Sequence, residues 1–278
     1  MEKKPEWLRK KISINTIALM RKRLNENKIH TICEEALCPN ISECYAKKEA
    51  SFLILGNICT RRCLFCNVRK YQKPLPVDEN EPENVALTVR SLGLKNVVIT
   101  SPTRDDLKDG GATQFALTIK KIRGISPETK IETLIPDFNG DMNSVKIVIE
   151  AKPDIISHNL ETVRNLYHIR NGANYEISLS ILSFIKENSN IKTKSGIMLG
   201  LGEKEEELIE LFNDLLRSGC KLLSIGQYIA PSKRHYPVIE YIKPEYFDYL
   251  KNICYKMGFE YVESSPYTRS SYNADKYI

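Results

Sequence analysis

The sequence predicts an α/β protein built on a partial (β/α)6-type TIM barrel, with an extension at each end of the barrel. From about residue 51 onward, short runs rich in β-branched residues alternate with amphipathic stretches. Strands that alternate with helices of roughly 10–15 residues are typical of βαβ units and a parallel sheet. Chemically unusual residues follow the strands, as expected where functional groups lie at the carboxyl ends of barrel strands.

The alternating pattern predicts three parts: an N-terminal extension (1–50), a barrel (51–258) and a C-terminal extension (259–278). Right-handed crossovers make closure of such units into a full or partial barrel natural. The expected strands are 51–55, 96–100, 130–135, 154–157, 175–180, 194–199 and 222–226. The expected helices are 83–94, 113–123, 141–151, 161–170, 203–218 and 244–257.

Composition narrows the classes of function. The chain has 278 residues, a net charge of +6 and 42% hydrophobic residues, enough for one large core. A run of about 18 apolar residues does not occur, so we expect no membrane span. Residues 1–11 are charged and lack the apolar region of a secretion signal, so we expect a cytoplasmic protein. Basic and aromatic residues form no common stripe, so nucleic acid is not an expected partner.

Six of the eight cysteines lie between Cys33 and Cys66. An even number of cysteines is compatible with disulfides, but crowding without a secretion signal favours metal binding. The other two, Cys220 and Cys254, lie in helix or strand patterns, where buried and unreactive thiols are expected.

Cys59, Cys63 and Cys66 have the spacing C-x3-C-x2-C directly after the first expected strand. Three thiolates on one loop can bind three irons of a cubane cluster and leave the fourth iron without a protein ligand. Electron-transfer clusters normally have four cysteine ligands, so an open iron indicates a place for a small molecule. Structural zinc prefers four closed ligands in two close pairs, which this loop lacks. Phe65 is expected to shield the cluster.

Cys33, Cys38 and Cys44 form a second group with the spacing C-x4-C-x5-C. The spacing again supplies three ligands without a fourth nearby. Taken alone, this group is equally compatible with structural zinc and with an iron–sulfur cluster.

The loop 59–66 resembles that of the radical S-adenosylmethionine superfamily, whose fold is a partial or full βα barrel with this loop after the first strand. The resemblance implies that the amine and carboxylate of S-adenosylmethionine chelate the open iron. One electron would then cleave the sulfonium and give a 5′-deoxyadenosyl radical. The cofactor supplies the difficult chemistry, and the protein supplies position and exclusion of water.

Together, the two cysteine groups and several further segments resemble the lipoyl synthase family. The likeness runs from about residue 30 to the C-terminus. The matching segments are 33–40, 59–66, 104–107, 109–112, 132–138, 158–163, 194–203, 225–228, 231–232 and 269–272.

This resemblance implies two [4Fe-4S] clusters, of which the extensions carry the auxiliary one. Its fourth ligand would be a serine of the segment 269–272, with Ser271 favoured and Ser270 as the alternative. The segment holding Gly196, Met198 and Gly200 would border the adenine. Asn159 and Glu161 would lie near the methionyl or ribose part. For Arg104, Asp105 and Asp106, contact with a ligand and a salt-bridged loop both remain open.

The implied reaction inserts sulfur at C6 and then C8 of an octanoyl chain, which is amide-linked to a lysine of a lipoyl carrier domain. The carrier would be a glycine cleavage H protein or a 2-oxoacid dehydrogenase E2 subunit. The cluster on Cys33, Cys38 and Cys44 would donate the sulfur and be consumed. Flavodoxin or ferredoxin would supply electrons, and cluster-assembly proteins are further implied partners.

Two alternatives remain at this stage. A different radical enzyme with an auxiliary cluster would share the loop 59–66. The segments 33–44 and 269–272 argue against it. A non-catalytic electron carrier would need four ligands for each cluster, and Cys220 or Cys254 would have to serve.

Overall fold

The computed structural model describes residues 4–273 and 276–277. The chain folds into two compact units. The first unit comprises residues 10–61 and 67–156. The second unit comprises residues 4–9, 62–66 and 157–277.

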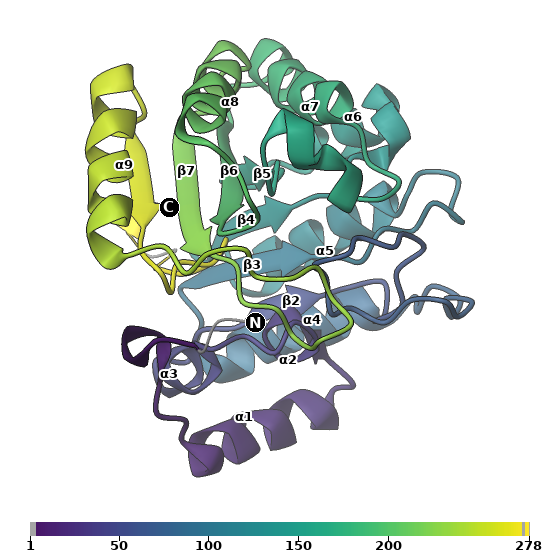
Figure 1. The fold of residues 1–278 in the computed structure, drawn as a ribbon. Helices are drawn as coiled ribbons and strands as arrows, with labels where there is room; N and C mark the ends of the chain where they lie inside the picture. The colour runs from purple at the N-terminus through teal and green to yellow at the C-terminus, as the bar shows by residue number, and fades with distance from the viewer. Residues whose placement is uncertain (1–3, 274–275, 278) are drawn as a thin grey trace. The chain divides into compact units, whose positions relative to one another are not determined.

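The first unit holds a mostly parallel sheet (Figure 1). Its strands are β1 (His30–Thr31), β2 (Ser51–Leu53), β3 (Asn96–Thr100), β4 (Lys130–Leu134) and the start of β5 (Ile155–Ser157), adjacent in chain order. β1 pairs antiparallel with β2, and β2, β3 and β4 pair in parallel. Its helices are α1 (Ile14–Glu26), α2 (Ile32–Glu35), α3 (Ile41–Ala46), α4 (Glu81–Leu92), α5 (Ala112–Ile125), α6 (Met142–Glu150) and the 3-10 helix η2 (Phe138–Gly140).

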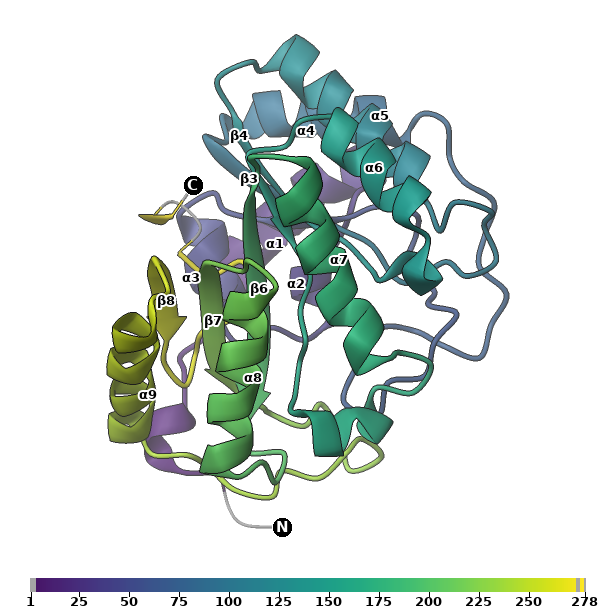
Figure 2. The same cartoon turned by 90° about the horizontal axis from the view of Figure 1, so that it is seen from above.

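Helices α4, α5 and α6 lie side by side in the first unit (Figure 2). Helix α4 shows why these segments form helices. It has proline in its first turn, and it ends at Gly93, whose φ of 64° is left-handed. Val85, Val89 and Leu92 are buried at the i, i+4 and i+7 positions of one face. An apolar stripe of this kind holds the helix to its neighbours.

The second unit repeats the pattern with a parallel sheet in the order β6-β7-β8 (Figure 1). The strands are β6 (Lys192–Leu199), β7 (Leu222–Gln227) and β8 (Tyr261–Ser264). The helices are α7 (Tyr175–Asn188), α8 (Glu205–Arg217), α9 (Pro244–Met257) and the 3-10 helices η1 (Glu6–Leu8) and η3 (Arg164–Ile169).

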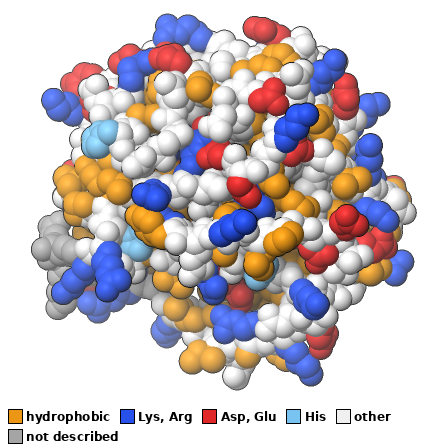
Figure 3. Space-filling model, turned by 90° about the vertical axis from the view of Figure 1, so that its right-hand side faces the viewer, with side chains coloured by type: hydrophobic (Ala, Val, Ile, Leu, Met, Phe, Trp, Pro, Cys, Tyr) orange, Lys and Arg blue, Asp and Glu red, His pale blue; other side chains and the backbone are white. Residues whose placement is uncertain are grey.

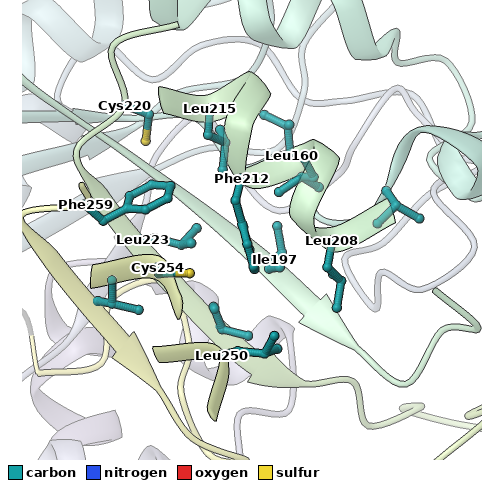
Figure 4. Close-up of a cluster of buried hydrophobic side chains, with 14 of the residues drawn as sticks. Leu160, Ile197, Leu208, Phe212, Leu215, Cys220, Leu223, Leu250, Cys254 and Phe259 are labelled. Atoms are coloured by element: carbon teal, nitrogen blue, oxygen red, sulfur yellow. The ribbon is translucent and has the colours of Figure 1, made fainter. Parts of the chain in front are cut away.

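The core of the second unit lies where α8 and α9 meet β6 and β7 (Figure 4). Phe212 and Phe259 are fully buried or nearly so, and their rings meet edge to face with centroids 6.3 Å apart. Cys220 and Cys254 lie among these side chains, each 0% exposed. Burial raises the pKa of both thiols to about 12. Buried, protonated thiols were expected here from the sequence.

Six of the seven expected strands are present, but the expected strand 175–180 is wrong because α7 begins there. The side chain of Asn174 caps this helix by accepting from the Ile177 amide at 3.0 Å. Tyr175, Ser178 and Leu182 are buried on one helical face. Over six residues, alternation of apolar and polar side chains imitates a strand, and only the longer window shows the helical period.

Two further elements differ from expectation. Residues 161–170 were expected to form a helix, and the structure has the shorter 3-10 helix η3 within them. β8 was not expected, although it pairs in parallel with β7. Its four residues are too few to show a clear alternation of apolar and polar side chains.

In the described part of the chain, no helix has both the length and the apolar character needed to cross a membrane. On the face drawn in Figure 3, lysine and arginine side chains are interspersed with acidic ones. This face does not show the single basic stripe of a nucleic-acid-binding surface.

Candidate active site

In the first unit, the loop after β2 begins with two residues in the left-handed region, Leu55 (φ 67°) and Gly56 (φ 78°). The Glu81 carboxylate accepts from the Leu55 amide at 2.8 Å, which fixes this turn. Further on, the Cys59 amide donates to the Arg69 carbonyl at 2.8 Å, next to a parallel bridge between Ile58 and Arg69. Hydrogen bonds at Leu55 and at Cys59 itself therefore hold the backbone that carries the Cys59 side chain.

The side chain of Arg61 is buried between the loops that follow β3 and β4. Its guanidinium donates to both oxygens of Asp137 at 2.5 Å, and to both oxygens of Asp105 at 3.0 and 3.1 Å. It also donates to the side-chain oxygen of Asn139 at 2.7 Å. Burial by itself lowers the pKa of Arg61, but the bonds to the two carboxylates raise it above its ordinary value.

Arg61 lies between two cysteines of the loop, so this network fixes the chain beside Cys59. The Arg61 amide also donates to the Cys59 sulfur at 3.4 Å. The motifs 59–66 and 132–138 contained Arg61 and Asp137, but no role was expected for either residue. The available signal was an arginine inside the cysteine loop and an aspartate directly after a strand.

Arg104 is 2% exposed and binds the backbone on both sides of the cysteine loop. It donates to the carbonyls of Leu55 at 2.9 Å and Leu75 at 3.0 Å. Asp106 accepts two further bonds from it at 2.8 and 2.9 Å. Arg104 and Asp106 thus form one ion pair, while Asp105 pairs with Arg61. Of the two alternatives for this segment, the structure shows the salt-bridged loop.

The second cysteine group folds into two short helices joined by a turn. Thr31 caps α2 by accepting from the Glu34 amide, and Cys33 is buried on this helix. Leu37, with φ of 51°, reverses the chain, so that the Cys38 amide reaches the Cys33 carbonyl at 3.0 Å. Cys44 follows on α3, with its amide bonded to the Asn40 carbonyl at 2.9 Å.

The thiols of this group influence one another electrostatically. Burial, and then the charge of Cys38, raises the pKa of Cys33 to about 12. Burial, and then the charges of Cys33 and Cys38, raises the pKa of Cys44 to about 12. With these raised pKa values, Cys33 and Cys44 stay protonated near neutral pH unless a cation is bound, and bound iron reverses this by stabilising the thiolates. The donor set therefore fits a cationic cluster.

All eight cysteines are thiols rather than disulfides. Among the described residues, no three histidine, cysteine, aspartate or glutamate side chains are placed to share one metal ion. In an iron–sulfur cubane, each cysteine binds a different iron, so its ligands need not converge on a single point.

In the second unit, the segment 62–66 is held by backbone bonds on both sides of Leu64. Its amide donates to the Ile169 carbonyl at 2.8 Å, and its carbonyl accepts from the Tyr236 amide at 2.9 Å. Phe65 packs against a small apolar cluster that contains Leu201 and Tyr228. Cys63 and Cys66 are half-buried beside this aromatic side chain.

The residues expected near S-adenosylmethionine come together at the end of β5 and along β6. The Glu161 amide donates to the Gly196 carbonyl at 2.9 Å, and the Met198 amide donates to the Glu161 carbonyl at 2.9 Å. Asn159 donates to the Glu161 carboxylate at 3.0 Å. A Cβ at Gly196 would lie 2.8 Å from the Asn159 side chain, so glycine is required there. Burial raises the pKa of Glu161.

The segment around Gly200 forms a tight turn. Gly200 has φ of 91°, and a Cβ there would lie 2.3 Å from the Glu240 carbonyl. The Glu203 carboxylate accepts from the amides of Gly200 at 2.7 Å and Leu201 at 2.9 Å. Glu203 thereby satisfies the amides at the end of β6. No role had been expected for it from the sequence.

The C-terminal segment packs on β6 through Lys194, which is 1% exposed. Its ammonium donates to the Ser270 carbonyl and the Tyr277 hydroxyl, and it lies 4.0 Å from the centre of the Tyr277 ring. The Ser270 hydroxyl donates to the Asn159 side chain at 3.1 Å. Lys194 is a further residue that the sequence did not single out. A lysine in the middle of a buried strand was the available signal.

Comparison with known proteins agrees with this geometry. The family described as the radical SAM superfamily matches residues 53–215. A lipoyl synthase of Geotalea uraniireducens (strain Rf4) is 55% identical over 276 residues, covering 99% of this chain and 97% of that protein. A lipoyl synthase of Trichlorobacter lovleyi is 52% identical over 278 residues, covering 100% and 99%.

Solved structures show the same fold at low identity. Methylornithine synthase has a TM-score of 0.57 at 13% identity and covers 81% of this chain and 76% of that chain. SuiB of Streptococcus suis, bound to S-adenosylmethionine, has a TM-score of 0.60 at 14% identity and covers 88% and 61%. These likenesses confirm the α/β fold class expected from the sequence.

The chain belongs to the radical SAM superfamily, as its cysteine loop after β2 and its parallel βα architecture had indicated. Within that class it belongs to the lipoyl synthase family, whose members match it over nearly their whole length. It is therefore a sulfur-inserting radical enzyme whose cofactors are [4Fe-4S] clusters and S-adenosylmethionine.

Proposed function

We propose that this chain inserts two sulfur atoms, at C6 and C8, into an octanoyl chain carried by a lipoyl carrier domain. The observation that carries the proposal is the match of the whole chain to lipoyl synthases at 52–55% identity. When bound, the clusters and S-adenosylmethionine supply the hydrogen-abstracting radical and the sulfur. The residues of this chain hold these groups and position them.

Cys59, Cys63 and Cys66 are the proposed ligands of the first cluster. The bond from the Arg61 amide to the Cys59 sulfur supports this assignment, since hydrogen bonds to cluster sulfurs tune the iron. The buried pairing of Arg61 with Asp137 keeps the loop in position.

Cys33, Cys38 and Cys44 are the proposed ligands of the auxiliary cluster, with Ser271 as the fourth. The hydrogen bond from the Cys38 amide to the Cys33 carbonyl at 3.0 Å, which brings these two residues together, supports this assignment. Ser271 is favoured over Ser270 because of the resemblance of the segment 269–272 to the lipoyl synthase family. The auxiliary cluster would thus draw on the parts 1–50 and 259–278 that extend the proposed barrel (51–258).

Asn159, Glu161, Gly196, Met198 and Gly200 are the proposed S-adenosylmethionine-binding residues. Their backbone and side-chain contacts at the ends of β5 and β6 support this grouping. The Glu161 side chain is partly buried, and this burial raises its pKa. A site that excludes water protects a reactive radical from side reactions.

The proposed partners follow from the chemistry. The carrier would be a glycine cleavage H protein or a 2-oxoacid dehydrogenase E2 subunit, and flavodoxin or ferredoxin would supply electrons. Cluster-assembly proteins would restore the sulfur that each turnover removes. We propose a cytoplasmic location, and neither a membrane nor nucleic acid as a partner.

The test is an anaerobic assay of the reconstituted protein with dithionite, S-adenosylmethionine and an octanoyl-lysine peptide. Mass spectrometry follows 5′-deoxyadenosine and the peptide. We expect deoxyadenosine together with a peptide that has gained two sulfur atoms. Cys63→Ala should abolish S-adenosylmethionine cleavage, whereas Cys38→Ala should retain cleavage and lose sulfur insertion.

Other outcomes separate the alternatives. Deoxyadenosine with an unchanged peptide would keep the radical chemistry but point to another substrate. Neither product, from protein shown to hold both clusters, would favour an electron carrier. If Cys38→Ala still formed the sulfur-containing peptide, the assignment of the sulfur donor would be wrong.

A further inference from the structure

Within the first unit, Glu35 joins the segment 33–44 to the two residues Asn57 and Asn67, which flank the segment 59–66 in the sequence. Its side-chain oxygen Oε1 accepts from Nδ2 of Asn57 at 2.9 Å. Its backbone carbonyl accepts from Nδ2 of Asn67 at 2.7 Å. His30 lies 4.0 Å from the same Oε1, which is beyond hydrogen-bond distance. A single residue thus receives two amide donors from separate points of the chain.

The positions of these partners in the sequence give the link its meaning. Glu35 lies between Cys33 and Cys38 and is the last residue of α2. Asn57 and Asn67 stand on either side of the segment that carries the other three cysteines. Glu35 is two residues from Cys33, a proposed ligand of the auxiliary cluster. Asn57 and Asn67 are within two residues of Cys59 and Cys66, proposed ligands of the first cluster.

The link is built to be rigid. The Glu35 side chain is 17% exposed, so its bond to Asn57 is largely shielded from water. The bond to Asn67 uses a helix backbone carbonyl, which has no rotatable side chain. The start of the loop 59–66 is also fixed, because the Cys59 amide donates to the Arg69 carbonyl at 2.8 Å. Few internal rotations therefore remain between α2 and the backbone that carries Cys59.

We propose that Glu35 is a positioning residue that fixes the auxiliary-cluster loop relative to the loop of the first cluster. The inference rests on the proposed function, in which one substrate carbon must meet the radical source and the sulfur source in turn. Misplacement by about 1 Å can cost a factor of about 100 in a positioned reaction. A loosened link therefore lets S-adenosylmethionine be cleaved without transfer of sulfur.

The test compares Glu35→Ala with Glu35→Gln and with the matched control Glu34→Ala. The control removes the neighbouring glutamate of α2, which pairs with Arg21 at the surface instead. The readout is the number of deoxyadenosine molecules formed for each sulfur inserted, at equal iron content. Glu35→Ala should raise this ratio by about ten- to a hundredfold, the effect of losing one hydrogen bond to a charged group. Glu35→Gln keeps an acceptor for Asn57, so it should stay near the parent ratio, as should the control.

A second measurement does not depend on activity. In the iron-free protein, hydrogen exchange of the amides at 57–60 and 67–69 should become faster in Glu35→Ala and remain unchanged in Glu35→Gln. Asn57→Ala removes the donor from the opposite side of the bond. It should raise the ratio as Glu35→Ala does, with no further increase in the double variant. If Glu35→Ala does not bind iron, the Asn57→Ala variant replaces it in the test.

The possible failures are distinct. A parent protein that forms no sulfur-containing product contradicts the proposed function itself. A parent protein that is active, with Glu35→Ala or Asn57→Ala giving the parent ratio and parent exchange rates, overturns the positioning role alone. Equal defects in Glu35→Ala and Glu34→Ala would assign the effect to general loss of α2 and also overturn it.

Discussion

Arg61→Met should destabilise the protein by about 3–5 kcal/mol, the cost of leaving one partner of a buried ion pair without the other. The side chains of Arg61 and Asp137 are 6% and 2% exposed, and both Asp137 oxygens accept from the guanidinium. Methionine fills a similar volume but leaves the carboxylate in a site that water barely reaches. The second partner, Asp105, is 28% exposed and should contribute only about 1 kcal/mol, because solvent replaces its lost contact.

The assay is urea unfolding of the reduced, iron-free protein, followed by circular dichroism. Arg61→Met, Asp137→Asn and the double variant form a double-mutant cycle. The double variant should cost less than the sum of the two single changes, since each one already removes the same interaction. Lys121→Met serves as the control in the same unit. It removes an ion pair whose side chains are 53% and 42% exposed, and should cost less than about 1 kcal/mol.

Two results would refute this reasoning. One is an Arg61→Met variant no less stable than Lys121→Met, and the other is a double variant whose cost equals the sum. Arg61→Lys separates charge from geometry, because an ammonium cannot reproduce the paired bonds of the guanidinium. We expect that variant to retain the fold but to lose S-adenosylmethionine cleavage, as the chain beside Cys59 is no longer fixed.

Three further predictions concern other parts of the fold. Gly111→Ala should be less stable than Gly56→Ala by about 1–3 kcal/mol in urea unfolding. Both glycines have left-handed φ, 93° and 78°, but only the new methyl at Gly111 would meet a side-chain atom, at 2.2 Å. Asp154→Asn should lose stability near neutral pH and approach the parent as the solution becomes acidic. Burial opposes ionisation of Asp154, yet the hydrogen bonds that its carboxylate accepts hold its folded-state pKa below its ordinary value. The stabilisation is therefore complete above that value and disappears as pH falls through the folded-state pKa, and equal differences between the two proteins at every pH would contradict this. Cys220→Ala and Cys254→Ala should bind as much iron per chain as the parent, because both thiols are buried with pKa near 12. Loss of iron from either variant would instead assign it as a fourth ligand.

Local patterns were sufficient to predict most elements of the fold. The strand expected at 96–100 and the helix expected at 244–257 have the same bounds in the structure as in the prediction. The prediction of a strand at 175–180 was wrong because its short alternation of apolar and polar residues is shared by strands and by the first turns of an amphipathic helix. The Asn174 cap and the buried residues further along the segment stabilise the helix instead. Competing patterns of this kind are resolved by packing, which a six-residue window does not contain.

By itself, the sequence determined which residues are the candidates for the chemistry. Cysteine spacing is local, so Cys59, Cys63 and Cys66 could be proposed as a ligand set without any tertiary contact. The parallel pairing of β2 with β3 and of β3 with β4, and thus the position of the loop after β2, also followed from alternating elements.

Only the tertiary structure decided what holds those ligands in place. Arg61 meets Asp105 and Asp137 across 44 and 76 residues of chain, and Glu35 meets Asn57 across 22. Before folding, each of these polar side chains is satisfied by water, and nothing in its sequence neighbourhood names its partner. Burial removes that water, and every buried polar group must then be paired within the fold. The identity of the partners is therefore a property of the packed protein.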